Sequence, residues 1–111
     1  MIEYEKIENY LNFLGFSKKH IGYRYLVELI KTASKKDVSP LKEKGYVEVS
    51  EKFRTNPNTV EKDIQYLISK TFEKGNVSIL YKEFGESIDS SKGKPTNKQF
   101  IYNTLEKLKY Y

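Results

Sequence analysis

The chain has 111 residues, of which 38% are hydrophobic and 32% are charged, and this balance predicts one small soluble domain with a modest core. It has no cysteine, which excludes disulfides and thiolate metal sites, and we expect no cofactor. No apolar run approaches the roughly 20 residues of a membrane helix and no signal peptide is evident, so we expect a cytoplasmic protein. The net charge of +5 favours a polyanionic partner only modestly.

The first third of the chain predicts two amphipathic helices. The first covers residues 2–14 and ends at Gly15. Ser17 is a candidate N-cap for the second, over residues 17–34. The residues expected to face inward are Ile7, Leu11, Leu14, Ile21, Tyr25, Leu29 and Ile30.

The middle of the chain predicts a helix-turn-helix. After a polar loop at residues 35–39, Ser39 and Pro40 signal a helix start, with one helical turn at residues 41–44. Residues 46–53 form the first helix of the pair, with Val49 and Phe53 inward.

The second helix of the pair has the strongest local signals. Asn56 can cap it, Pro57 suits the first helical position, and it runs over residues 57–73 to a left-handed Gly75. Its apolar face consists of Val60, Ile64, Leu67, Ile68 and Thr71. Its opposite face consists of Asn58, Thr59, Lys62, Gln65, Tyr66 and Ser69. Such a polar face is what a helix in a DNA major groove requires.

The C-terminal part predicts two more helices. The first covers residues 78–84 and is closed by Gly85, and a loop follows at residues 86–94. Thr96 and Gln99 have capping-box spacing and open the last helix. Its inward residues are Phe100, Ile101, Leu105 and Leu108. No strand pattern is convincing, so residues 1–111 are predicted to form one all-α domain, a bundle of about six helices.

Three segments between residues 11 and 108 resemble a known family at nearly constant spacing. They are Leu14-Gly15-Phe16 with residues 20–26; residues 46–53 with Val60, Glu61, Lys62 and Ile64; and Lys74-Gly75-Asn76-Val77 with Phe84-Gly85, Lys94-Pro95-Thr96-Asn97 and Phe100-Ile101. The chain resembles the C-terminal DNA-binding domain of stage zero sporulation protein A, the master sporulation response regulator. The resemblance implies a six-helix bundle that binds promoter DNA, often in tandem copies, and activates or represses transcription.

Two departures from that family affect the expected function. The chain shows no receiver domain, so we expect a stand-alone relative or an excised domain. The family also has arginines where this chain has Thr59, Lys62 and Gln65, and it has serine at Asn58, whereas Glu61 is retained. The resemblance implies base-reading roles for these five positions. The substitutions predict a different preferred site, either richer in A·T or bound more weakly.

Five residues are candidates for phosphate contacts. Thr55 and Asn56 lie at the predicted helix start, where phosphates bind readily. Lys92, Lys94 and Lys98 surround the start of the last helix. Alternatively, Asn56 serves only as a helix cap, and the three lysines are solvated side chains without a phosphate contact.

Four further lysines form two pairs, Lys18 with Lys19 and Lys35 with Lys36. Solvation is the favoured interpretation for both pairs, and contact with phosphate is the alternative. His20, the sole histidine, is expected at a helix start rather than in proton transfer.

Two functional hypotheses from different classes remain. The first is a sequence-specific regulator that binds double-stranded DNA, with self-association on tandem sites and an RNA polymerase subunit as further candidate partners. The second is a receiver-free protein-interaction module that acts as an antagonist or adaptor of a transcription regulator or polymerase. An enzyme is not expected, because no nucleotide-binding, zinc-protease or nucleophile motif is present.

Overall fold

The structure is a computed structural model that describes residues 2–88 and 91–110. The helices in these ranges are α1 (Tyr4–Leu14), α2 (Ile21–Lys35), α3 (Gly45–Lys52), α4 (Pro57–Lys74), α5 (Val77–Phe84) and α6 (Asn97–Lys109), with a 3-10 helix, η1 (Gly85–Ser87), after α5. The described part contains no strand, which confirms the all-α prediction. The Cα radius of gyration is 12.9 Å, close to the ~13 Å of a packed chain of about 100 residues.

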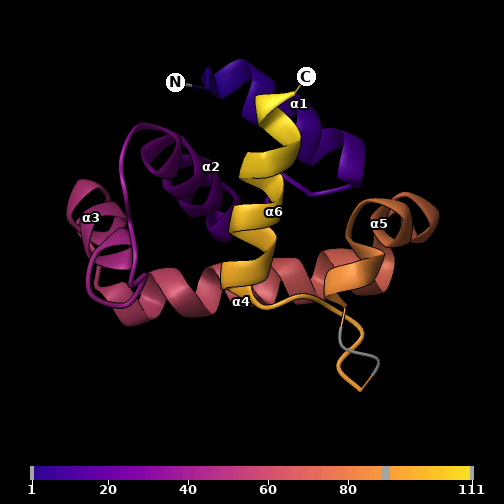
Figure 1. Cartoon of the computed structure of the whole chain (residues 1–111). Helices are drawn as coiled ribbons and strands as arrows, with labels where there is room; N and C mark the ends of the chain where they lie inside the picture. The colour runs from indigo at the N-terminus through magenta and orange to yellow at the C-terminus, as the bar shows by residue number, and fades with distance from the viewer. Residues whose placement is uncertain (1, 89–90, 111) are drawn as a thin grey trace.

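The longest helix, α4, runs along one side of the molecule, where α2, α3, α5 and α6 pack on it, whereas α1 packs on α2 (Figure 1). α2 and α3 make the most extensive contacts with α4. α3 lies toward one end of α4 and α5 toward the other (Figure 1). The start of α1 and the end of α6 lie on the side of the molecule opposite α4 (Figure 1). One complete face of α4 is therefore left outside the bundle.

The predicted apolar face of α4 forms the centre of the core. Val60, Ile64 and Leu67 have no exposed surface, and each such burial contributes about 1.5–3 kcal/mol. The Phe84 and Phe100 rings stack with centroids 4.9 Å apart, which joins the end of α5 to α6. Tyr25, which was expected to face inward, is buried, and so are Tyr23 and Tyr46.

Two of the three predicted N-caps, Asn56 and Thr96, are confirmed. The Asn56 side chain accepts a hydrogen bond from Thr59 N at 2.9 Å, and Pro57 occupies the first turn of α4. Gln99 N donates to Thr96 Oγ1 at 3.1 Å, and Thr96 N donates to Gln99 Oε1 at 2.9 Å. These bonds satisfy backbone donors that a helix start leaves unpaired, so the starts of α4 and α6 are fixed locally.

The predicted start of α2 is wrong. The helix begins at Ile21 with His20 at the N-cap position, whereas Ser17 Oγ accepts from Lys19 N within the preceding turn. Ile21 is 49% exposed rather than buried. Gly22 explains the difference, because a methyl group there would lie 2.3 Å from the carbonyl oxygen of Asp63 in α4. This close packing, rather than a local cap, positions the first turn of α2.

Two other turns differ from their predictions. Gly75 is extended (φ −80°, ψ −158°) rather than left-handed, and a methyl group there would lie 2.5 Å from Thr71 O, so this glycine serves close packing. No helix starts at Ser39 and Pro40. Residues 41–44 form a turn in which Lys44 N donates to Pro40 O at 2.9 Å. Gly45 N then donates to Val38 O at 3.1 Å, which folds the segment back before α3 begins.

Candidate functional site

α3 and α4 form the predicted helix-turn-helix. The turn between them is closed by Thr55 N, which donates to Ser50 O at 2.9 Å. Arg54 adopts a left-handed conformation with φ 55°, which reverses the chain direction at this point. The Phe53 ring contacts the Tyr25 ring edge-on at a centroid distance of 5.2 Å. The turn is thereby anchored to α2, and the first turns of α4 are held at the surface.

The structure brings the five predicted base-reading residues together on the outer side of α4. Asn58, Lys62 and Gln65 are exposed, whereas Thr59 and Glu61 are half-buried at its edges. Positions three and four apart are neighbours on a helix, so these side chains form a continuous polar strip. Tyr66 extends the strip and is 53% exposed.

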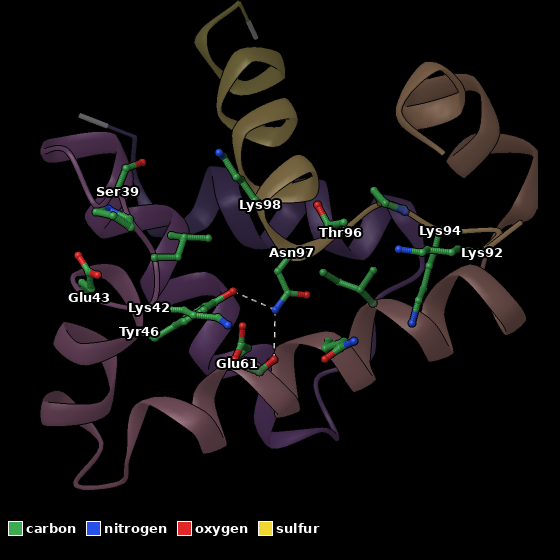
Figure 2. A pocket seen from close by; sticks show the side chains of 15 residues that line it. Ser39, Lys42, Glu43, Tyr46, Glu61, Lys92, Lys94, Thr96, Asn97 and Lys98 are labelled. Atoms are coloured by element: carbon green, nitrogen blue, oxygen red, sulfur yellow. Dashed lines mark hydrogen bonds between the residues drawn. The ribbon is translucent and has the colours of Figure 1, made fainter. Parts of the chain in front are cut away.

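A groove of about 590 Å³ runs beside this strip. α4 forms one wall, the segment of residues 39–46 forms another, and the segment of residues 92–98 forms a third (Figure 2). Its apolar lining includes Pro40, Leu41, Ile68 and Pro95. Its charged lining comes from Lys42, Glu43, Glu61, Lys92, Lys94 and Lys98. The lysines outnumber the carboxylates, so the groove is better suited to an anionic group than to a cation.

Asn97 joins the groove walls. Its Nδ2 donates to Tyr46 Oη of α3 at 3.1 Å and to Glu61 O of α4 at 3.1 Å (Figure 2). Burial raises the pKa of the Tyr46 hydroxyl; the hydrogen bond from Asn97 opposes this, and the Glu61 carboxylate adds to it. Tyr46 therefore stays neutral as an acceptor. The first residue of α6 is thus tied to both helices of the helix-turn-helix.

The predicted phosphate-contact residues fall into two groups. Thr55, half-buried, and Asn56, exposed, precede α4, and the Asn56 side-chain oxygen is already used as a cap. Lys92 and Lys98 are exposed beside the groove. Lys94 is half-buried and its ammonium donates to Ser69 Oγ of α4.

The sequence-based prediction missed two residues of this region. Lys42 belongs to a segment expected only as a turn, and no local pattern places it opposite residues 92–98. Asn97 follows the N-cap Thr96 at the first helical position of α6, where a side chain would ordinarily be solvated. A side-chain amide next to a cap is a weak signal of a long-range bridge, and it could have identified Asn97.

Within residues 2–88 and 91–110, no group of three or more His, Asp or Glu side chains could hold a metal ion. None of the described helices is long and apolar enough to cross a membrane. The arrangement can offer hydrogen-bonding side chains from one helix face, with ammonium groups next to it.

A comparison of the sequence with models of protein families finds one matching family. The sequence model of the family described as "Sporulation initiation factor Spo0A C terminal" matches residues 7–108. The match runs from α1 to α6 and confirms the resemblance found in the sequence. The family is one of DNA-binding effector domains of transcription regulators in sporulation rather than of enzymes.

Proposed function

Because the chain belongs to the Spo0A C-terminal family of DNA-binding domains, we propose that it is a sequence-specific transcription regulator whose recognition helix is α4. The observation that carries the proposal is the exposed polar strip on α4 beside a lysine-lined groove. A major groove about 12 Å wide admits one helix. The outer face of α4 is the face that can enter it, because the opposite face is the core.

The strip supports an altered sequence preference. Lys62 lies at its centre and can donate to guanine acceptors or to a phosphate, but it lacks the fork geometry of arginine. Gln65 can pair with adenine, Thr59 can contact a thymine methyl, and Glu61 can accept from cytosine. We therefore propose a preferred site richer in A·T than the sites read by family members with arginines at these positions.

The lysines beside the strip support a phosphate-binding role. Lys92, Lys94 and Lys98 would meet one DNA strand alongside the groove, and Thr55 and Asn56 would meet the backbone near the start of α4. Each phosphate neutralised makes binding more salt-dependent. Self-association on tandem sites and contact with an RNA polymerase subunit belong to the same proposal, and they rest on the family resemblance alone.

The test is a selection from randomised duplexes with the purified chain, followed by titrations of the enriched site. Lys62→Ala should lower affinity about 5- to 150-fold, since a base contact contributes about 1–3 kcal/mol. Lys82→Ala is the matched control, because Lys82 is an exposed lysine of α5 and should leave affinity unchanged. Helix content should be the same in both variants. An unchanged affinity of Lys62→Ala would show that α4 does not read the site.

The competing function is a protein-interaction module that acts as an antagonist or adaptor. The observation that favours it is that Thr59, Lys62 and Gln65 occupy positions where the family has arginines. This function predicts no enriched duplex, and only weak binding that disappears at physiological salt. An enriched motif that depends on Lys62 would rule it out as the main function.

A further inference from the structure

α4 has a second flank, on the side away from the groove. We infer that this flank and the turn of residues 17–20 form a second backbone-binding surface, which contacts the DNA strand opposite the one beside the groove. The inference rests on the proposed function, because it assumes that α4 enters a major groove. It adds to the helix-turn-helix and the groove a contact from the turn of residues 17–20, which belongs to neither.

The geometry of α4 separates the two flanks. Successive residues of a helix are turned by about 100°, so Glu61, Gln65 and Ile68 lie along one side. The groove lining contains these three residues. Thr59, Asp63, Tyr66 and Lys70 follow one another at intervals of four, three and four, and therefore lie along another side. The exposed Lys62 lies between the two sides, in the middle of the polar strip.

Contacts on the second flank hold the 17–20 turn against α4. The His20 ring meets the Tyr66 ring edge-on, with centroids 5.9 Å apart. Lys70 Nζ lies 5.6 Å from the centroid of the Tyr66 ring. The packing of Gly22 on the Asp63 carbonyl fixes the first turn of α2 at the same place. The turn and α4 therefore form one surface that is already in place without a ligand.

The charge and exposure of this surface suit a phosphodiester backbone. Lys18 and Lys19 are exposed, and Ser17 Oγ accepts from Lys19 N at 3.3 Å, which shapes the turn that presents them. Tyr66 adds a hydroxyl on a side chain that is 53% exposed. Among the four residues of the second flank, Thr59, Asp63, Tyr66 and Lys70, Asp63 is the one with an acidic side chain, and it is half-buried.

The partner follows from the shape of duplex DNA. A helix in the major groove has a sugar–phosphate backbone on each side, because both strands border that groove. Lys92, Lys94 and Lys98 would lie beside one strand. The second strand would then pass the opposite flank of α4, where the 17–20 turn presents its two lysines. Contacts to both strands would fix the rotation of α4 about its own axis, which decides the bases that its side chains reach.

The first experiment measures the salt dependence of binding to the duplex selected by the wild-type chain. The variant Lys18→Gln with Lys19→Gln removes two charges and keeps two polar side chains. The control, Lys82→Gln with Lys109→Gln, removes two exposed lysines from α5 and α6. The plot of log affinity against log salt should become shallower by about 1 to 2 in the variant. The control should keep the wild-type slope.

The second experiment assigns the contact to a strand. Two modified duplexes are prepared. In each, the phosphates that border the major groove on one of the two strands are replaced by neutral methylphosphonates. Wild type should lose affinity for both modified duplexes, whereas the Lys18/Lys19 variant should lose further affinity for only one.

The outcomes separate this inference from the proposed function. Salt-dependent binding whose slope is the same in the Lys18/Lys19 variant and the control would overturn the second surface and leave the function standing. Additional losses of the variant on both modified duplexes would also overturn it. Failure of wild type to bind any duplex would remove the proposed function, and this inference with it.

Discussion

The contact of Gly22 with α4 makes Gly22→Ala an informative substitution. The new methyl group would lie 2.3 Å from Asp63 O and 2.9 Å from Asp63 C, whereas ordinary van der Waals contact begins near 3.4 Å. Because both atoms belong to the backbone of α4, relief requires a helix to move by about 1 Å. Overpacking of this kind costs about 1–3 kcal/mol.

Because the clash is with backbone atoms, we take the upper end of this range, about 2–3 kcal/mol. The intrinsic helix preference of alanine offsets about 1 kcal/mol of that cost, so the free energy of unfolding should fall by about 1–2 kcal/mol. The melting temperature of a domain of this size should then fall by roughly 4–15 °C, measured by circular dichroism. DNA affinity should fall as well, because the displaced segment belongs to the proposed recognition helix.

Gly85→Ala is the matched control. No atom lies within 4 Å of a methyl group at Gly85, and its backbone is right-handed helical, with φ −51° and ψ −38°. The same chemical change should there stabilise the protein by about 0.4–1 kcal/mol. A Gly22→Ala protein as stable as wild type, or more stable, would refute the argument that this contact fixes α2 on α4.

Two further predictions concern side chains. Asn97→Ala should weaken DNA binding by more than its loss of stability accounts for, because Tyr46 and the Glu61 carbonyl lose a shared donor. DNA titration and thermal unfolding measure the two effects. Equal losses of binding and unfolding free energy would indicate a purely structural role. Burial, with a smaller contribution from Glu8, raises the pKa of Tyr23 to about 12 from 10.0. The stabilisation from its neutral hydroxyl is therefore present below pH 10 and is lost as the pH rises to about 12. Tyr23→Phe should flatten the alkaline fall in urea-unfolding free energy over that window, and an unchanged curve would contradict the assignment.

The features that could be predicted from the sequence have their causes within a few residues. Asn56 and Thr96 accept hydrogen bonds from backbone donors only three residues away. The residue types and their spacing were therefore sufficient to predict both caps. The apolar face of α4 is likewise a periodic signal within one helix. The structure therefore confirms the two faces predicted for that helix.

The features that could not be predicted depend on contacts between distant segments. Ser17 has a suitable side chain for a cap, but the start of α2 follows the packing of Gly22 on Asp63. Gly75 was expected to be left-handed, yet it is needed for its lack of a side chain near Thr71. The groove likewise exists only because residues 39–46 and 92–98 meet beside α4. No local pattern encodes such a meeting.

The position of the start of α1 and the end of α6 has a consequence for copies joined by a tether. The start of α1 and the end of α6 lie opposite α4 (Figure 1), so a tether attached at either place would leave the molecule from the side turned away from the face that we propose to bind the duplex. Copies joined through such tethers could occupy neighbouring sites without threading a linker past the DNA. Their joint occupancy would then depend on the length and stiffness of the tether, which set the effective concentration of the second copy.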